Sequence, residues 1–576
     1  VSAVSAVTAS NVPSISFMEN LFGAEFPEAF GSTDGCSAKS KKTILDLPAE
    51  ILEIVCEYIS KLDIKRLRLA NKRLADSVYL RIDRVYISPN RANLDYLHII
   101  LAHPRYKGRV HEIVFDGTRL EEYPTLESFR KAILLDERDT RRAIDSRLDE
   151  ALDIYGDDSP ECQLLDEEGM YKDEDRYLTD NVKKILLRYE DDFTRDVLAR
   201  NATMMSTENS YAVYRALYDE EQEIVRQQLD ADALHQALAG FPKLKRITLT
   251  SEAWWPWNVR PRYFTPFHRS LPPGFRKPIV YPDHHNRPAT QGVPNVHRSS
   301  EPDQSKCRAY AIILSALLSM PVPSIEEFIV DSENSQTGMP LHVFDPTSAF
   351  FKDTRFTLQR TPLKRLRLSF VYCFCPKKTN LEDIPNGNMA VHVLLSELNN
   401  LEHLDLNMRD RSISHSDPLL IPDLTLAQLK TLTLRHCEMR ADDLYDLLIM
   451  LKNVQHVTLF HMTHEGGEAV HWGQLFQRLK EYYANTMQGT NPHYTIVEPY
   501  EFDEAEDLFG TTESFSHLID DDVDAFLYED AEYPFLDSAA EVQHEGNFMK
   551  RHVGWRVHDR DWEARERMAE VSGRKR

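Results

Sequence analysis

Glycine is scarce in this sequence, with only 20 among 576 residues. Loops that cradle the phosphates of a nucleotide are rich in glycine, because glycine lets the backbone approach the phosphates closely. No such loop is present. Cysteine is scarcer still: its seven copies are an odd number scattered along the chain and do not make a disulfide framework. We therefore expect a reducing compartment, the cytoplasm or the nucleus.

Long apolar runs are missing as well. No run of 18 or more apolar residues occurs, whereas a helix needs about 20 to cross a membrane. Positive charge is in deficit too, since 68 Lys and Arg stand against 92 Asp and Glu, giving a formal net charge of −24. A field of that sign repels DNA, RNA and anionic membrane surfaces. We expect neither a nucleic acid nor a membrane among the partners.

The sequence also lacks a convincing catalytic or metal-binding set. Cys373 and Cys375 have no second pair at zinc spacing. The acidic run at 520–522 lacks the glycine turn and the distal glutamate of a calcium loop. We therefore predict no catalytic residue, no metal and no cofactor, and expect that the protein is not an enzyme.

Composition divides the chain into four parts. Residues 1–42 are rich in Ser and Ala and are expected to form a disordered leader, and residues 43–80 have a compact helical pattern. Residues 81–480 form the predicted body, with an acidic helical insert at 121–230 and a basic, aromatic insert at 252–305. Residues 481–576 are predicted to be an acidic, then basic, largely disordered tail, because 498–545 holds 17 Asp and Glu and no Lys or Arg.

A short aliphatic motif, Leu-x-x-Leu-x-Leu with aliphatic substitutes, occurs eight times in the predicted body. The instances begin at Ile82, Val110, Leu244, Ile325, Leu363, Leu401, Leu429 and Val454, so the steps between them are 28, 134, 81, 38, 38, 28 and 25 residues. Apolar helical runs precede five of them, at 92–102, 231–239, 306–319, 388–398 and 441–451. We predict an α/β fold in which an irregular leucine-rich-repeat-like solenoid carries helical and loop insertions.

The segment 43–80 resembles an F-box. Its matching positions are Leu47, Pro48, Glu50, Ile51, Ile54, Val55, Ile59, Leu62, Asp63, Ile64, Leu67, Asn71, Lys72, Arg73 and Leu74. The Cys and Trp that are common near the end of the motif are absent. The layout downstream is similar to that of large fungal F-box proteins. The resemblance implies a three-helix F-box that binds a Skp-family adaptor and, through it, the cullin core of a ubiquitin ligase.

The first predicted helix is apolar on more than one face, which leaves one face for a partner. We predict that the adaptor-binding residues and their immediate support are Leu47, Pro48, Ile51, Leu52, Val55, Ile59, Leu62 and Leu67. An ordinary helix bundle packed on the body is the alternative interpretation of this segment.

Two regions of the body are candidates for binding a protein substrate. The residue between two aliphatics of a strand points to the opposite face of the sheet. The candidates on that face and beside it are Arg365, Arg367, His403, Asp405, Arg435 and Phe460. The basic insert adds Trp255, Arg260 and Arg262. Alternatively, the strand face is a solvated surface that binds nothing, and the insert folds back over the core and pairs with acidic segments.

The sequence therefore predicts a substrate receptor of a Skp–cullin–F-box ubiquitin ligase, with an unidentified protein as substrate. One alternative is a repeat scaffold that uses the same helices for another assembly, without a role in ubiquitination. Another is an enzyme with a divergent fold. Co-purification of adaptor and cullin separates the first two, and turnover by the isolated chain would support the third.

Overall fold

The computed structural model describes two compact units, residues 1–81 and 82–576. The described residues are 44–133, 203–250, 263–278, 308–320, 324–331, 339–340, 349–371, 387–408, 426–435, 437, 439, 441–460, 462, 472–486, 491–497, 518–519, 521–529 and 531. The predicted leader lies outside these ranges, as do Trp255, Arg260 and Arg262. Across the described ranges, every helix is too short or too polar to cross a membrane.

Three short helices, α2 (Ala49–Tyr58), α3 (Lys61–Ala70) and α4 (Lys72–Ser77), make up most of the first unit, after a single turn η1 (Ile44–Asp46). The side chain of Ser60 caps α3 by accepting from the N–H of Asp63 at 3.0 Å. Asn71 caps α4 in the same way. The helices share a small core of Leu52, Cys56, Ile64, Leu74 and Val78.

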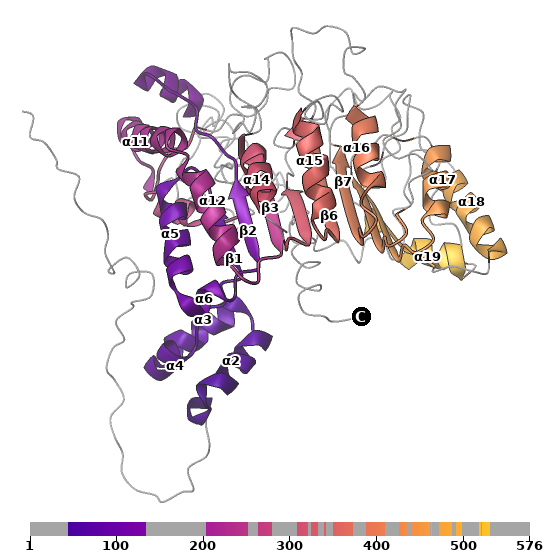
Figure 1. Ribbon diagram of the computed structural model, residues 1–576, viewed down its shortest axis with the longest axis horizontal. Coiled ribbons are helices and arrows are strands. Elements are labelled where there is room, and N and C mark those ends of the chain that lie inside the picture. The colour runs from indigo at the N-terminus through magenta and orange to yellow at the C-terminus, as the bar shows by residue number, and fades with distance from the viewer. Residues whose placement is uncertain are drawn as a thin grey trace, which may run out of the picture. The chain divides into compact units, whose positions relative to one another are not determined.

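One long sheet organises the second unit (Figure 1). Nine of its described strands form an unbroken run of parallel neighbours: β1 (Arg84–Ile87), β2 (Glu112–Asp116), β3 (Arg246–Thr250), β4 (Glu327–Asp331), β6 (Arg365–Val371), β7 (His403–Met408), β8 (Thr431–Arg435), β9 (His456–Phe460) and β10 (His493–Val497). The two-residue strand β5 (Met339–Pro340) also pairs with β6, and β11 (Leu518–Ile519) runs antiparallel to β10. The strands follow one another in chain order.

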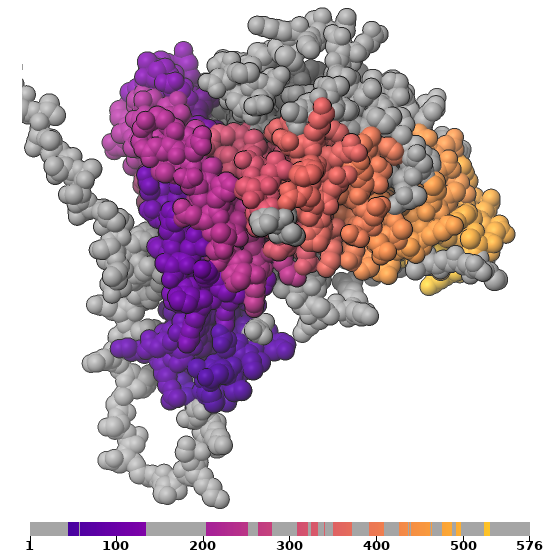
Figure 2. Space-filling view, in the orientation of Figure 1, coloured from indigo at the N-terminus to yellow at the C-terminus, as the bar shows by residue number. Residues whose placement is uncertain are grey.

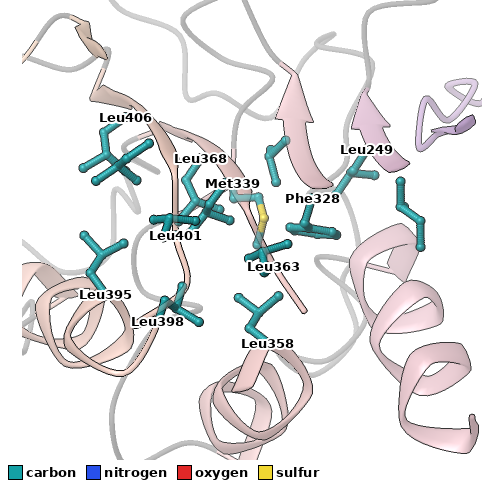
Figure 3. Close-up of a cluster of buried hydrophobic side chains, with 14 of the residues drawn as sticks. Leu249, Phe328, Met339, Leu358, Leu363, Leu368, Leu395, Leu398, Leu401 and Leu406 are labelled. Carbon is teal, nitrogen blue, oxygen red and sulfur yellow. The ribbon is translucent and has the colours of Figure 1, made fainter. Parts of the chain in front are cut away.

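One face of this sheet is aliphatic and carries the main core. Leu366, Leu404 and Leu432 are direct register partners on neighbouring strands, and all three are buried. Helices bring matching side chains to the same layer. Figure 3 shows Leu368 and Leu406 from the strands with Leu358 and Leu395 from helices. Alternation of aliphatic and polar residues thus decides which face each strand buries.

Helices follow the strands and cover the aliphatic face. The described ones are α5 (Arg91–Ala102), α6 (Pro104–Lys107), α12 (Leu229–Gly240), α14 (Arg308–Ser319), α15 (Ala349–Arg360), α16 (Gly387–Ser396), α17 (Ala441–Met450) and α18 (Trp472–Asn485). In the space-filling view their side chains hide the strands that lie behind them (Figure 2). The five predicted helical runs and the eight predicted strand motifs are confirmed at these places.

The two predicted inserts share a second core. Phe129 from residues 121–133 and Tyr214 from α11 (Thr207–Arg226) pack with Phe267 and Phe275 of residues 263–278. The close approach depends on Gly274, whose φ is +73°. A Cβ there would lie 1.8 Å from the carbonyl oxygen of Thr203, so no other residue fits. Residues 134–202 of the acidic insert, and 252–262 and 279–305 of the basic insert, lie outside the described ranges.

The sheet continues beyond the predicted end of the body at residue 480. Strands β10 and β11 and helix α19 (Asp521–Tyr528) lie within the segment predicted as a tail. Val523, Phe526 and Leu527 of α19 are buried in the main core. The predicted boundary at 480 is therefore too early. The high density of acidic residues suggested a tail, but α19 still presents an apolar face to the core.

The predicted fold, an F-box followed by a leucine-rich-repeat-like solenoid, is wrong. The structure is an α/β fold built on one sheet of parallel strands with helices. The motif Leu-x-x-Leu-x-Leu predicted strands correctly, but its Leu-x-Leu part occurs in any strand with one buried aliphatic face. Steps that range from 25 to 134 residues do not define a repeat. The three helices of the first unit likewise do not by themselves identify an F-box.

Candidate docking surfaces

Helix α2 is apolar on two sides. One side, with Leu52 and Cys56, faces the small core of the first unit. The other carries Ile51, Ile54 and Tyr58, which are 43%, 51% and 85% exposed. Their spacing of three and four residues places them in one stripe along the helix. Exposing this apolar stripe to water costs free energy, and burying it against a partner would remove that cost.

Helix α3 repeats the arrangement. Ile64 is buried in the core, whereas Leu62 and Leu69, seven residues apart, are half exposed. In the part of the chain that the structure describes, six of the eleven exposed large apolar side chains belong to residues 44–69. The first unit is therefore the region with the densest exposed apolar surface among the described residues.

The residues predicted to bind the adaptor fall into two groups. Pro48, Ile51 and Leu62 are exposed, so they are available to a partner. Leu52 is buried in the core, and Leu47, Ile59 and Leu67 pack against it; Val55 is half buried. Ile54, Tyr58 and Leu69 were not among the predicted adaptor-binding residues. Helical spacing from Ile51 and Leu62 would have found them.

The polar face of the sheet in the second unit carries a ladder of alternating charge. Register partners across five neighbouring strands are Arg84, Glu112, Arg246, Glu327 and Arg365. Each charge lies beside opposite ones: Arg84 Nε is 2.7 Å from Glu112 Oε2, and Arg246 Nε is 2.8 Å from Glu327 Oε2. Arg365 Nε completes the row at 3.6 Å from Glu327 Oε2. The row neutralises most of its own charge.

A second set of charges lies deeper on the same face. Arg367 contacts Asp331 at 3.3 Å and Asp405 at 3.5 Å, and Arg435 contacts Asp405 at 3.1 Å. The guanidinium of Arg435 also lies 5.5 Å from the centre of the Phe460 ring. Only 10% of the Arg367 side chain is exposed. The charged groups of this set therefore bind one another.

The structure thus brings together the six predicted substrate-binding residues of the strands, but with partners that the sequence did not reveal. His403 also has one, the Thr431 hydroxyl at 2.8 Å. The acidic partners come from strands far away in sequence, and only the register of the sheet places them beside the arginines. The arrangement supports a structural role for these charges at least as well as a binding role.

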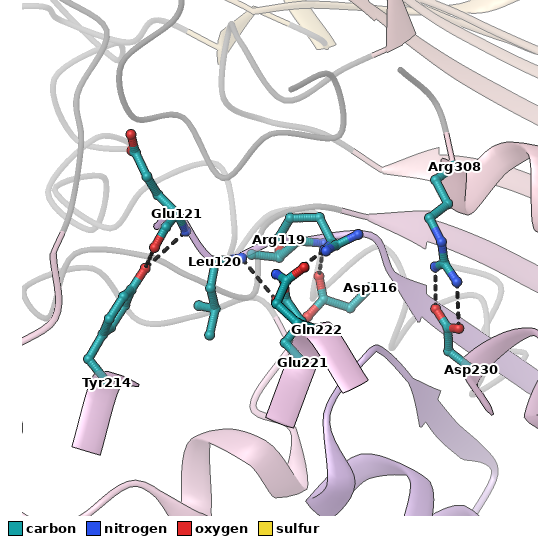
Figure 4. Close-up of polar contacts among 10 residues, drawn as sticks. Asp116, Arg119, Leu120, Glu121, Tyr214, Glu221, Gln222, Asp230 and Arg308 are labelled. Carbon is teal, nitrogen blue, oxygen red and sulfur yellow. Dashed lines mark hydrogen bonds and ion pairs between the residues drawn. The ribbon is translucent and has the colours of Figure 1, made fainter. Parts of the chain in front are cut away.

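Buried carboxyl groups join α11 to the segment that follows β2 (Figure 4). Glu221 accepts from Arg119 Nε at 2.7 Å and from the N–H of Leu120 at 2.9 Å. Burial raises the pKa of Glu221 to about 7, against the opposing effect of Arg119. Burial likewise raises the pKa of Asp116 to about 6. Glu221 and Asp116 are 4% and 3% exposed, so the pair has little access to a substrate.

Further polar contacts fix the same junction. The hydroxyl of Tyr214 donates to the carbonyl oxygen of Glu121 at 2.8 Å and accepts from its N–H at 2.9 Å. Nearby, Arg308 forms an ion pair with buried Asp230. These groups hold helices in place. Among the described residues no group of three or more His, Cys, Asp or Glu is arranged to hold a metal ion.

A short segment between the two cores presents an exposed aromatic ring. Tyr263 and Thr265 are buried, whereas Phe264 between them is 52% exposed. The Phe264 ring stacks on His268, with centroids 5.8 Å apart, and the Arg269 guanidinium lies 5.5 Å from the ring centre. Arg269 is one of the basic residues that mark the predicted insert, whereas the sequence analysis did not single out Phe264.

Comparisons with known proteins do not add an identity to this geometry. No protein-family model matches the chain, and no curated protein matches it.

Proposed function

We propose that the protein is a substrate receptor of a Skp–cullin–F-box type ubiquitin ligase. In this role the first unit binds a Skp-family adaptor and the second unit holds a protein substrate, in the cytoplasm or the nucleus. The chain itself carries no catalysis; it brings the substrate close to the other subunits, which raises the effective concentration of the reacting groups.

The observation that carries this proposal is the exposed apolar stripe of α2. Ile51, Ile54 and Tyr58 lie on the same helix as Leu52, which is only 3% exposed. The unit therefore has a core of its own and still has apolar side chains left over. Residues 43–80 also carry the sequence resemblance to an F-box, and the stripe includes two of its matching positions, Ile51 and Ile54.

The test compares adaptor binding by the full chain and by matched variants. Complete burial of an apolar side chain contributes roughly 1.5–3 kcal/mol, so burying two half-exposed ones contributes about 2 kcal/mol. We expect the double variant Ile51→Ala with Ile54→Ala to bind a purified Skp-family adaptor at least tenfold more weakly, by surface plasmon resonance. Met450→Ala, which removes an apolar side chain of the second unit that is 43% exposed, should bind like the wild type.

A second variant separates loss of docking from loss of folding. Leu52→Ala should destabilise the first unit, seen as faster amide hydrogen exchange in α2 and α3, because it empties a core position. The double variant of the stripe should keep wild-type exchange. If it binds the adaptor as tightly as the wild type does, the proposal is wrong. A wild type that binds no adaptor would also contradict the proposal and leave the alternative of another assembly.

A further inference from the structure

The segment 263–278 is held rigidly by buried anchors. The hydroxyl of Tyr263 donates to the carboxylate of Asp331, and the Arg84 guanidinium lies 5.2 Å from the centre of its ring. The N–H of Phe267 donates to the Asn93 side chain at 3.0 Å, and Asn93 is fully buried. Thr265 caps α13 (Pro266–Ser270), and its hydroxyl accepts from the N–H of His268. Phe264 and Arg269 are thus exposed on a fixed backbone.

Arg269 differs from the arginines of the sheet. Arg84, Arg246, Arg365, Arg367 and Arg435 all have carboxylate partners. Arg269 is exposed, and its side chain makes no ion pair with any described residue; its close contact is the ring of Phe264. Among the described residues, no carboxylate neutralises the charge of Arg269.

Helix α13, which carries Arg269, packs against α5, and two further aromatic side chains belong to this region of the second unit. They are Tyr86 of β1 and Tyr96 of α5, both partly exposed. Burial raises the pKa of each hydroxyl, and the positive charge of Arg269 acts on both in the opposite direction. A guanidinium beside an exposed ring offers charge, hydrogen-bond donors and apolar area together, the combination that dominates protein–protein hot spots.

From these contacts we propose that Phe264 and Arg269, with Tyr86 and Tyr96, form a docking surface for an acidic segment of a partner protein. A carboxylate of the partner would bind Arg269, whose planar guanidinium suits two parallel hydrogen bonds. An apolar side chain beside it would cover the exposed ring of Phe264. The rigid backbone lowers the entropy lost on binding. The inference rests on the proposed function only where it would call this partner a substrate.

The test uses the purified full chain on an array of 12-residue peptides. Acidic peptides that contain one Leu or Phe are compared with peptides in which Lys replaces every acidic residue. We expect the wild type to retain acidic members and not their lysine counterparts. For the strongest of them, Arg269→Ala and Phe264→Ala should each weaken binding at least fivefold in fluorescence polarisation, and added salt should weaken it further.

Two control variants make the result specific. Arg130→Ala removes the same charge from another exposed arginine, one that is paired with Glu127. Phe356→Ala removes a ring that is equally exposed, at 52%, and that also lies under an arginine, Arg360. Both should bind within twofold of the wild type. Equal losses for Arg130→Ala and Arg269→Ala, or no preference for acidic peptides, would overturn the proposal.

Adaptor binding of the same variants distinguishes this proposal from the proposed function. Arg269→Ala and Phe264→Ala lie in the second unit, so they should bind the Skp-family adaptor as the wild type does. Peptide binding that survives Ile51→Ala with Ile54→Ala would show that the docking surface works even where the adaptor does not bind. Loss of peptide binding in that double variant would count against a surface formed by the second unit alone.

Discussion

The first unit and the polar sheet face of the second unit differ in the kind of side chain that they expose or pair. The three helices of the first unit bury five apolar side chains and leave others, such as Ile54 and Tyr58, in water. The sheet face instead gathers charged side chains and pairs them with one another, as Arg367 does with Asp331 and Asp405. Surface that is costly to leave exposed marks a docking site more clearly than charges that are already satisfied.

The largest expected effect tests whether the paired charges are structural. Arg367→Ala would leave the buried carboxylate of Asp331 without this cation, and Asp405, which is 21% exposed, with Arg435 alone. Removing one partner of a buried pair typically costs about 3–5 kcal/mol. We expect a loss of that size in the unfolding free energy, measured by urea denaturation and far-ultraviolet circular dichroism. Arg365→Ala, whose side chain is 28% exposed, should cost far less.

A stability loss near zero for Arg367→Ala would contradict the contrast between the exposed apolar first unit and the paired charges of the sheet face. The charges of the sheet face would then be free to serve a partner, as the sequence prediction for Arg365 and Arg367 assumed.

The next effect depends on pH. Burial raises the pKa of Glu221 to about 7 from its ordinary value of 4.5. Between these two values the folded protein holds a proton that the unfolded chain releases, so the unfolding free energy falls as pH rises through this window. At about 1.4 kcal/mol per pKa unit, the fall attributable to this group is about 3 kcal/mol.

Glutamine at position 221 does not titrate, so the unfolding free energy of Glu221→Gln should not show this decrease with pH. Denaturation midpoints of wild type and variant at pH 5, 6, 7 and 8 measure the difference, which should grow with pH and level off above 7. Parallel pH profiles would show that Arg119 compensates the buried charge completely.

The smallest effect is expected at the amino-terminal edge of the same sheet. Lys364 Nζ lies 3.0 Å from Glu326 Oε2, and about half of the lysine side chain is exposed. Exposed pairs contribute little, since water and salt screen them. Lys364→Ala should leave the urea midpoint unchanged within experimental error at 0.5 M salt. A clear loss there would mean that the edge is less accessible to water than its exposure indicates.

Much of the local structure was predictable because its causes are local. The spacing of apolar residues identified helices α5, α12, α14, α16 and α17 and eight of the strands. It missed α15, α18 and α19, whose apolar faces are interrupted by charged or polar residues. The two-residue strands β5 and β11 are too short to carry a pattern at all.

The sequence by itself determined which face of each strand is buried, because alternation along a strand directs every second side chain to the same side. It also determined that residues 43–59 have more apolar side chains than one helix face can hide. Only the tertiary structure decided which charges are paired. The partners of Arg367 lie on β4 and β7, and the second core joins Phe129 to Phe267 across more than a hundred residues. Contacts of this kind arise from strand register and packing between distant segments, and no local spacing encodes them.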